Sequence, residues 1–178
     1  MNKSRIIILE GPDGVGKSTI GRWIARFTGF PYFKNSKERI QKVHGDTRAL
    51  TEFMVPFMLD YWKQVPTNVI MDRFYPSEFV YGQVENRNVD LQLLADIDRE
   101  CATLNPLLLI FYKSAYYNEY NDQTTPFEKI KAIREKYDEF FHYTRIRNKF
   151  MFDTSREDLD QQIEEVTKYL EYSGITLR

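Results

Sequence analysis

Short apolar runs alternate along the chain with longer stretches of helical periodicity. The first, third and fourth runs are almost entirely apolar, as expected of strands buried on both faces of a sheet. The predicted strands are Arg5–Leu9, Pro31–Phe33, Asn68–Asp72, Leu107–Tyr112 and Lys149–Asp153. The predicted helices are Lys17–Thr28, Asp46–Gln64, Pro76–Glu85, Asp90–Thr103, Pro126–Tyr143 and Arg156–Tyr172, with N-caps expected at Asp46, Asp90 and Ser155.

This order of elements predicts an α/β fold. Right-handed crossovers between successive strands produce a parallel sheet with helices on both faces. The 178 residues suffice for one domain, which we expect to span residues 1–178. The segment Ser114–Thr125 has no apolar periodicity, and it is either a plain connection or a lid at about residues 114–126.

Composition narrows the classes of partner. Hydrophobic residues make up 42% of the chain and charged residues 29%, which is typical of a globular protein. A net charge of −1 disfavours binding to a nucleic acid polymer or an anionic membrane. Cys101 is the only cysteine, so we expect it to be a small buried hydrophobic residue on a helix. No leader-like or long apolar segment is seen, which favours a cytoplasmic location.

Residues 6–19, IIILEGPDGVGKST, contain the strongest chemical signal. Gly11, Gly16, Lys17 and Ser18 match the phosphate-binding pattern G-x-x-x-x-G-K-[ST], between a predicted strand and a predicted helix. Glycines allow a tight loop whose N–H groups face phosphate oxygens, and the start of the helix adds its positive dipole end. The residues predicted to surround ATP are Gly11, Pro12, Asp13, Gly14, Val15, Gly16, Lys17, Ser18 and Thr19.

The stretch VIMDRF, residues 69–74, is the second signal. Asp72 ends an apolar strand at the edge where open parallel sheets bind ligands. Asp72 and the Ser18 hydroxyl are therefore predicted ligands of a Mg²⁺ ion bound with ATP. Arg73 has the planar fork that suits phosphate. A surface Asp–Arg pair is the alternative, and the phosphate loop on the neighbouring strand favours the functional interpretation.

Two further carboxylates lie near the loop. Asp13 stands inside it, where an acidic side chain beside polyphosphate is unfavourable unless it faces a hydroxyl or a cation. A hydroxyl of an acceptor nucleotide is the simplest explanation. Glu10 ends the first strand and is a candidate for a similar role. For both residues, a solvated turn carboxylate is the alternative.

With EGPDGVGKST and DRFYPSEFVYG in view, the chain resembles thymidylate kinase and related deoxynucleoside kinases. The resemblance covers nearly the whole chain and implies a three-layer P-loop NTPase fold with a five-stranded parallel sheet. It implies ATP–Mg²⁺ as the donor, a (deoxy)nucleoside monophosphate as the acceptor, and a possible homodimer. Lys17, Asp72 and Arg73 would be the catalytic residues. The implied acceptor-binding residues are Glu10, Asp13 on the sugar 3′-hydroxyl, Phe53 or Phe57 on the base, Arg73 on the phosphate, Ser77, Tyr81 and Gln83.

The chain departs from the family pattern in two places. Gly82 follows Tyr81 where thymidylate kinases usually carry a glutamine near the base, although Gln83 is one residue further on. The family supplies a catalytic arginine from the loop or the lid, but this loop has Val15 and Ser114–Thr125 contains no arginine. The candidates for a replacement are Arg87, Arg134, Arg145 and Arg147.

The acceptor can be a monophosphate or a nucleoside. A monophosphate is already an oxyanion, whereas a nucleoside hydroxyl needs a carboxylate base, for which Glu10 or Asp72 are candidates. Related nucleoside kinases often read E-R-S where this chain reads D-R-F, which favours the monophosphate. Two other hypotheses are a P-loop NTPase switch and a nucleotide-binding domain without catalysis. The absence of an N-K-x-D tetrad, which is typical of guanine-binding switches, argues against the first of them.

Overall fold

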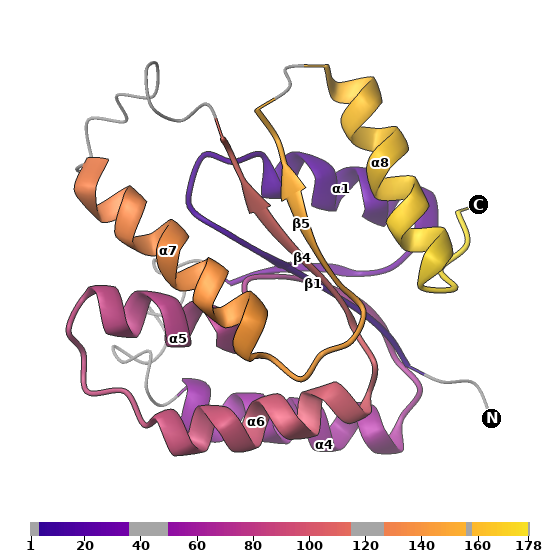
Figure 1. Ribbon diagram of the computed structural model, residues 1–178. Coiled ribbons are helices and arrows are strands. Elements are labelled where there is room, and N and C mark those ends of the chain that lie inside the picture. The colour runs from indigo at the N-terminus through magenta and orange to yellow at the C-terminus, as the bar shows by residue number, and fades with distance from the viewer. Residues whose placement is uncertain (1–3, 36–49, 115–126, 156–157, 178) are drawn as a thin grey trace.

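The computed structural model describes residues 4–35, 50–114, 127–155 and 158–177 (Figure 1). All the strands lie in one parallel five-stranded sheet of order β2-β3-β1-β4-β5. They are β1 (Arg5–Glu10), β2 (Tyr32–Lys34), β3 (Asn68–Asp72), β4 (Leu107–Tyr112) and β5 (Lys149–Asp153). The predicted α/β fold is thus confirmed, and the strand boundaries differ from the predicted ones only in β1 and β2.

The described helices cover both faces of the sheet (Figure 1). They are α1 (Lys17–Thr28), the π-helix η1 (Leu50–Met54), α4 (Val55–Gln64), α5 (Tyr75–Val84), α6 (Leu91–Thr103), α7 (Phe127–Tyr143) and α8 (Leu159–Tyr172). Alternate residues of each strand point to opposite faces. In β1, Ile6 and Ile8 therefore pack with α4 to α7, while Ile7 and Leu9 pack with α1 and α8.

The helix predicted over Asp46–Gln64 is divided where it is described. A π-helical turn over Leu50–Met54 precedes α4, which begins at Val55 with Pro56 in its first turn. Proline has no backbone N–H to donate to the preceding turn, so it is favoured at the start of a helix and disrupts helical hydrogen bonding across that point. Asp46 lies outside the described residues, as does the possible lid beyond Ser114.

The predicted N-caps had different outcomes. Asp90 caps α6 and accepts a 2.9 Å hydrogen bond from the backbone N–H of Leu93, as predicted. The prediction of Ser155 as the cap of the last helix was wrong, because α8 begins at Leu159 and Asp158 caps it. The Ser155 hydroxyl instead donates a 2.6 Å hydrogen bond to Asp153 at the end of β5.

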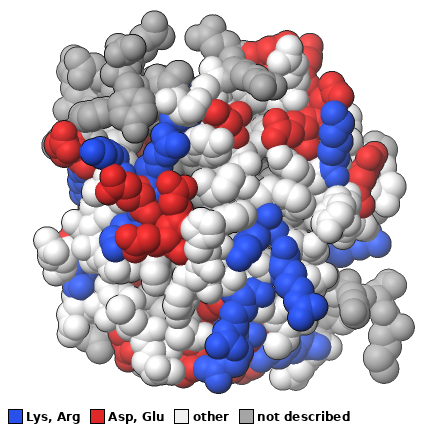
Figure 2. All heavy atoms as spheres, in the orientation of Figure 1, with Lys and Arg blue, Asp and Glu red and all other residues white. Residues whose placement is uncertain are grey.

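The burial of Cys101 and the distribution of surface charge both relate to expectations from composition. Cys101 is fully buried on α6, as predicted. On the face shown in Figure 2, acidic side chains gather at the left and at the upper right, and basic ones below the centre. The low net charge therefore conceals local patches of both signs. Within the described ranges, none of the helices has both the length and the apolar character needed to cross a membrane.

Candidate functional site

The phosphate loop connects β1 to α1 at the carboxyl edge of the sheet. Gly11 passes directly beside β4, where a Cβ atom would lie 2.2 Å from the carbonyl oxygen of Phe111. Gly16 occupies the N-cap of α1 with φ 83°, in the left-handed region that favours glycine. No side chain caps the start of α1. The loop therefore needs its glycines for steric reasons and presents the positive end of α1, as an anion site requires.

Lys17 is buried inside the loop. Its Nζ donates a 2.9 Å hydrogen bond to the carbonyl oxygen of Gly11 and a second one to Pro12. Burial, together with repulsion by Arg73, lowers the pKa of Lys17 to about 7. An anionic phosphate in the loop would favour the charged form of this lysine. The ammonium group of Lys17 thus lies inside the loop, and its contact with a phosphate stays a prediction.

Ser18 and Asp72, which the sequence predicts as Mg²⁺ ligands, are in direct contact. The Ser18 hydroxyl donates a 2.8 Å hydrogen bond to Oδ2 of Asp72. The hydroxyl of Tyr32, on β2, also donates to Oδ2, whereas the buried Oδ1 has no hydrogen-bond partner in the described structure. A hydroxyl and an unpaired carboxylate oxygen at a phosphate loop are hard oxygen ligands, so these residues fit Mg²⁺.

Arg73 lies directly after β3 and faces the phosphate loop. Its backbone adopts φ 72°, an uncommon value for a residue with a side chain. One terminal nitrogen donates to Asp13 Oδ1 at 2.7 Å and to the Tyr81 hydroxyl at 2.9 Å. The other donates to Ser77 at 3.2 Å and to Tyr137 at 3.3 Å. The structure thus brings three predicted site residues, Asp13, Ser77 and Tyr81, together around the guanidinium group of Arg73.

Asp13 and Glu10 differ in their surroundings. The Asp13 side chain is 79% exposed. Partial burial raises the pKa of Asp13, but the hydrogen bond and attraction to Arg73, together with the charges of Lys17 and Lys34, outweigh this effect and lower the pKa overall. Glu10 is fully buried and accepts hydrogen bonds from Phe74 N–H, Ser77 and Tyr137 at 2.7, 2.7 and 2.9 Å. Burial raises the pKa of Glu10 despite the attraction of Arg73. Direct contact of Glu10 with a substrate hydroxyl does not fit this burial. We therefore assign Glu10 the role of positioning Ser77 and Tyr137, which both contact Arg73.

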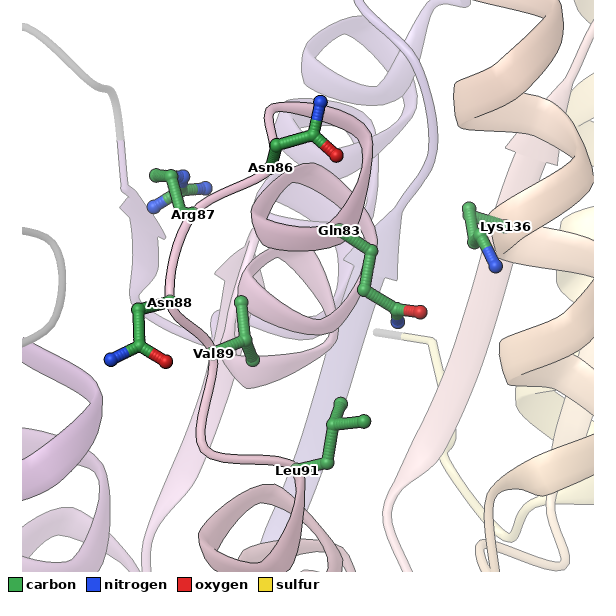
Figure 3. A pocket seen from close by; sticks show the side chains of 7 residues that line it. All are labelled: Gln83, Asn86, Arg87, Asn88, Val89, Leu91 and Lys136. Carbon is green, nitrogen blue, oxygen red and sulfur yellow. The ribbon is translucent and has the colours of Figure 1, made fainter.

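The residues implied for base recognition are more scattered. Phe53 and Phe57 lie four residues apart, in η1 and α4, and are 70% and 65% exposed. Gln83 donates to the carbonyl oxygen of Phe79 and lies two residues beyond Tyr81, so it leaves α5 on another side. Figure 3 shows its side chain in an open depression between the end of α5 and Lys136 of α7. We therefore leave Gln83 out of the acceptor site proposed below.

The surroundings of Gly82 leave little space for the glutamine that thymidylate kinases usually carry at the matching position. A Cβ atom at this position would lie 2.3 Å from Cγ2 of Val89 and 3.2 Å from a carboxylate oxygen of Glu78. The connection that follows α5 thus occupies the space that a larger side chain at position 82 would need.

The candidate arginines occupy three different places. Arg87 donates to both carboxylate oxygens of Glu78, at 2.9 and 2.8 Å. Arg145 and Arg147 lie between α7 and β5, at the amino edge of the sheet and opposite to the phosphate loop. Arg134, on α7, lies over the ring of Tyr112 with its guanidinium carbon 5.2 Å from the ring centre. Because Tyr112 ends β4, Arg134 lies at the carboxyl edge of the sheet.

Two site residues escaped sequence reasoning. Tyr32 reaches Asp72 from β2, and Tyr137 reaches Glu10 and Arg73 from α7. Each is separated by many residues from its partner, and an isolated tyrosine on an edge strand or on an amphipathic helix carries no local signal. The order of the sheet, which places β2 beside β3, is what reveals the first of them.

Comparisons with solved structures show the fold. Over 95% of this chain and 97% of the other, it superimposes on YorR protein from Bacillus subtilis in complex with phosphorylated GDP, with 21% identity and a TM-score of 0.71. Thymidylate kinase from Ehrlichia chaffeensis matches with 18% identity and a TM-score of 0.59, over 95% and 99% of the two chains. Deoxyadenosine kinase from M. mycoides with the products dCMP and dCDP matches with 21% identity and a TM-score of 0.59, over 94% and 98%.

Sequence comparison adds no family assignment. No protein-family model matches the chain, and no significant match is found among curated proteins. The structural likenesses, all at low identity, establish a P-loop nucleotide kinase-like fold for this chain.

Proposed function

We propose that this protein transfers the γ-phosphoryl group of ATP to a (deoxy)nucleoside monophosphate, giving the diphosphate and ADP. The observation that carries the proposal is the placement of Arg73. Its guanidinium lies beside the phosphate loop, and Asp13, Ser77, Tyr81 and Tyr137 hold it in one orientation. Once the exposed Asp13 moves aside, a planar guanidinium held at this edge is suited to an acceptor phosphate.

The donor side of the site rests on Lys17, Ser18 and the loop backbone. When bound with ATP, Mg²⁺ would neutralise charge that develops on the β- and γ-phosphate oxygens. Ser18 and Asp72 are the residues that would hold it. Lys17 adds a second positive charge from inside the loop, where burial in a low dielectric strengthens its attraction to phosphate.

The engagement of the carboxylates favours a monophosphate over a nucleoside. A nucleoside kinase needs a base near the 5′-hydroxyl, and Glu10 and Asp72 were the candidates. Both oxygens of Glu10 accept hydrogen bonds from the protein. One oxygen of Asp72 is engaged by Ser18 and Tyr32, and the other is assigned to the metal. A monophosphate, with a second pKa of about 6, supplies its own nucleophilic oxyanion and needs neither carboxylate as a base.

We assign to Arg134 the remaining positive charge that stabilises the anionic transition state. It occupies the same helix as Tyr137, one turn closer to the start of α7, and it lies over the last residue of β4. Arg87 is committed to Glu78 and Glu85, and Arg145 and Arg147 lie at the wrong edge of the sheet.

We propose dTMP as the first acceptor to test, because of the resemblance to thymidylate kinases. The structural neighbours hold different nucleotides, namely phosphorylated GDP in YorR protein and dCMP in deoxyadenosine kinase. A test should therefore cover all bases. Exposed Phe53 and Phe57 are the proposed stacking residues.

Coupled release of ADP is the decisive assay. The protein should be supplied with ATP and Mg²⁺, and then with each deoxynucleoside or its monophosphate. We expect turnover only with monophosphates. Faster turnover with any nucleoside than with its monophosphate would make the protein a nucleoside kinase, and equal ADP release without an acceptor would indicate an NTPase. No ADP release under any condition would support a binding-only domain.

A further inference from the structure

Asp72 presents its two carboxylate oxygens unequally. Oδ2 accepts hydrogen bonds from the hydroxyls of Ser18, at 2.8 Å, and Tyr32. Oδ1 is buried and has no hydrogen-bond partner in the described structure. A buried carboxylate oxygen without a partner is costly, so it indicates a ligand that is bound during function. Two donors on one oxygen also fix the rotation of the carboxylate, which is otherwise broad for this type of torsion.

The position of Tyr32 on β2 allows its hydroxyl to hold Oδ2 of Asp72. β2 pairs with β3 in a register that places Tyr32 opposite Ile70 and Lys34 opposite Asp72. The ring of Tyr32 packs on Gly21 of α1, where a Cβ atom would lie 2.6 Å from ring carbon Cε2 and 2.7 Å from Leu9. Glycine at position 21 therefore lets the ring lie close to α1. The ring is confined between the sheet and a helix, and its hydroxyl points along the sheet edge to Asp72.

We propose that Tyr32 is a positioning residue for the divalent cation, and that it acts by holding Oδ2 of Asp72 so that Oδ1 faces the ion or its water. The inference rests on the proposed function, because it takes Ser18 and Asp72 as the residues that hold Mg²⁺. Groups that orient a metal-binding carboxylate commonly change metal affinity or activity 10- to 100-fold when they are removed.

Tyr32→Phe is the test variant, since it keeps the ring on Gly21 and removes only the hydroxyl. Tyr169→Phe is a matched control, because the Tyr169 hydroxyl donates a 2.5 Å hydrogen bond to Glu165 within α8. Mn²⁺ would be titrated into each protein saturated with ADP, and the free ion followed by electron paramagnetic resonance. ADP affinity without metal and the melting temperature would be measured alongside.

We expect Tyr32→Phe to weaken Mn²⁺ binding about 10-fold, with ADP affinity in the absence of metal unchanged, and Tyr169→Phe to match the parent protein. In an Asp72→Asn background, the same Tyr32 substitution should cause no further loss of Mn²⁺ affinity, because Tyr32 acts only by orienting Asp72. Mn²⁺ affinity within about twofold of the parent would overturn the inference. So would equal losses in both backgrounds, or a lower melting temperature with unchanged metal affinity.

The two proposals fail in different ways. If the parent protein bound ADP but no Mn²⁺, both the metal site and the role of Tyr32 would be refuted. If the parent bound Mn²⁺ and phosphorylated a monophosphate while Tyr32→Phe behaved like it, the proposed function would stand and only the role of Tyr32 would fall.

Discussion

Arg73, at the end of β3, donates a 2.7 Å hydrogen bond to Asp13 in the phosphate loop, 60 residues earlier in the chain. The Arg73 side chain is largely buried and that of Asp13 is largely exposed. An exposed partner can move aside at little cost, because a solvent-exposed ion pair contributes at most about 1 kcal/mol. Under the proposed function, Asp13 would hold the arginine in place until a phosphate group binds, and it would then be available for a sugar hydroxyl.

Arg73→Lys tests the role of this arginine in acceptor recognition. The lysine keeps a positive charge near the buried Glu10 but loses the planar fork. We expect the KM for the acceptor to rise about 10- to 100-fold, as for a lost charge-assisted contact of roughly 1.5–3 kcal/mol. The KM for ATP should change little. A large loss of ATP binding with normal acceptor binding would place Arg73 on the donor side.

Lys17→Ala tests the phosphate loop. The lysine is buried, but its contacts are to the carbonyl oxygens of its own loop, so we expect the fold to be retained. Loss of its charge should reduce kcat by about 10²-fold or more, because the transition state would lose a buried cation. Circular dichroism checks the fold, and coupled ADP release measures the rate. Turnover near the parent rate would refute the assignment.

Glu10→Gln tests the buried carboxylate by its pH dependence. Burial raises the pKa of Glu10 above its ordinary value of 4.5, so the folded protein binds this proton to higher pH than the unfolded chain does. The parent protein should therefore lose stability relative to Glu10→Gln as the pH rises above 4.5 and through the folded-state pKa. Urea unfolding of both proteins between about pH 5 and pH 8 measures the difference. The opposite slope would mean that Arg73 outweighs burial.

Gly82→Gln tests whether steric crowding by Val89 excludes a glutamine at position 82. The new side chain would collide with Val89, so we expect a loss of about 1–3 kcal/mol in the free energy of unfolding. Adding Val89→Ala should restore part of that loss, and Val89→Ala alone is the reference for the comparison. Full stability of Gly82→Gln with Val89 present would show that the connection after α5 moves freely.

Arg134→Ala tests whether the charge of Arg134 stabilises the transition state. We expect kcat to fall about 10²-fold or more, with a smaller effect on the binding of either substrate. Arg147→Ala is the matched control, because Arg147 is an exposed arginine that follows the same helix at the amino edge of the sheet. Equal effects of the two substitutions would point to a general loss of charge and would exclude a specific role for Arg134.

The amino-acid sequence by itself determined the framework of this protein. The boundaries of α1, β3, β4 and β5 were predicted from local patterns alone. Local signals suffice there because burial on both faces requires continuous apolar runs, and because loop glycines and the Lys17–Ser18 pair have fixed places relative to a strand and a helix. The meeting of Ser18 and Asp72 followed from the rule that ligands bind at the carboxyl edge of a parallel sheet.

Only the tertiary structure decided which side chains complete the site. Tyr32 and Tyr137 contact Asp72 and Glu10 through strand order and helix packing, which no pattern of neighbouring residues reveals. Packing also filled the space beside Gly82 with Val89. The cap of α8 at Asp158 was missed because Ser155 has an equally suitable side chain. Its hydroxyl bonds to Asp153 instead, and the geometry at the end of β5 decides between two such partners.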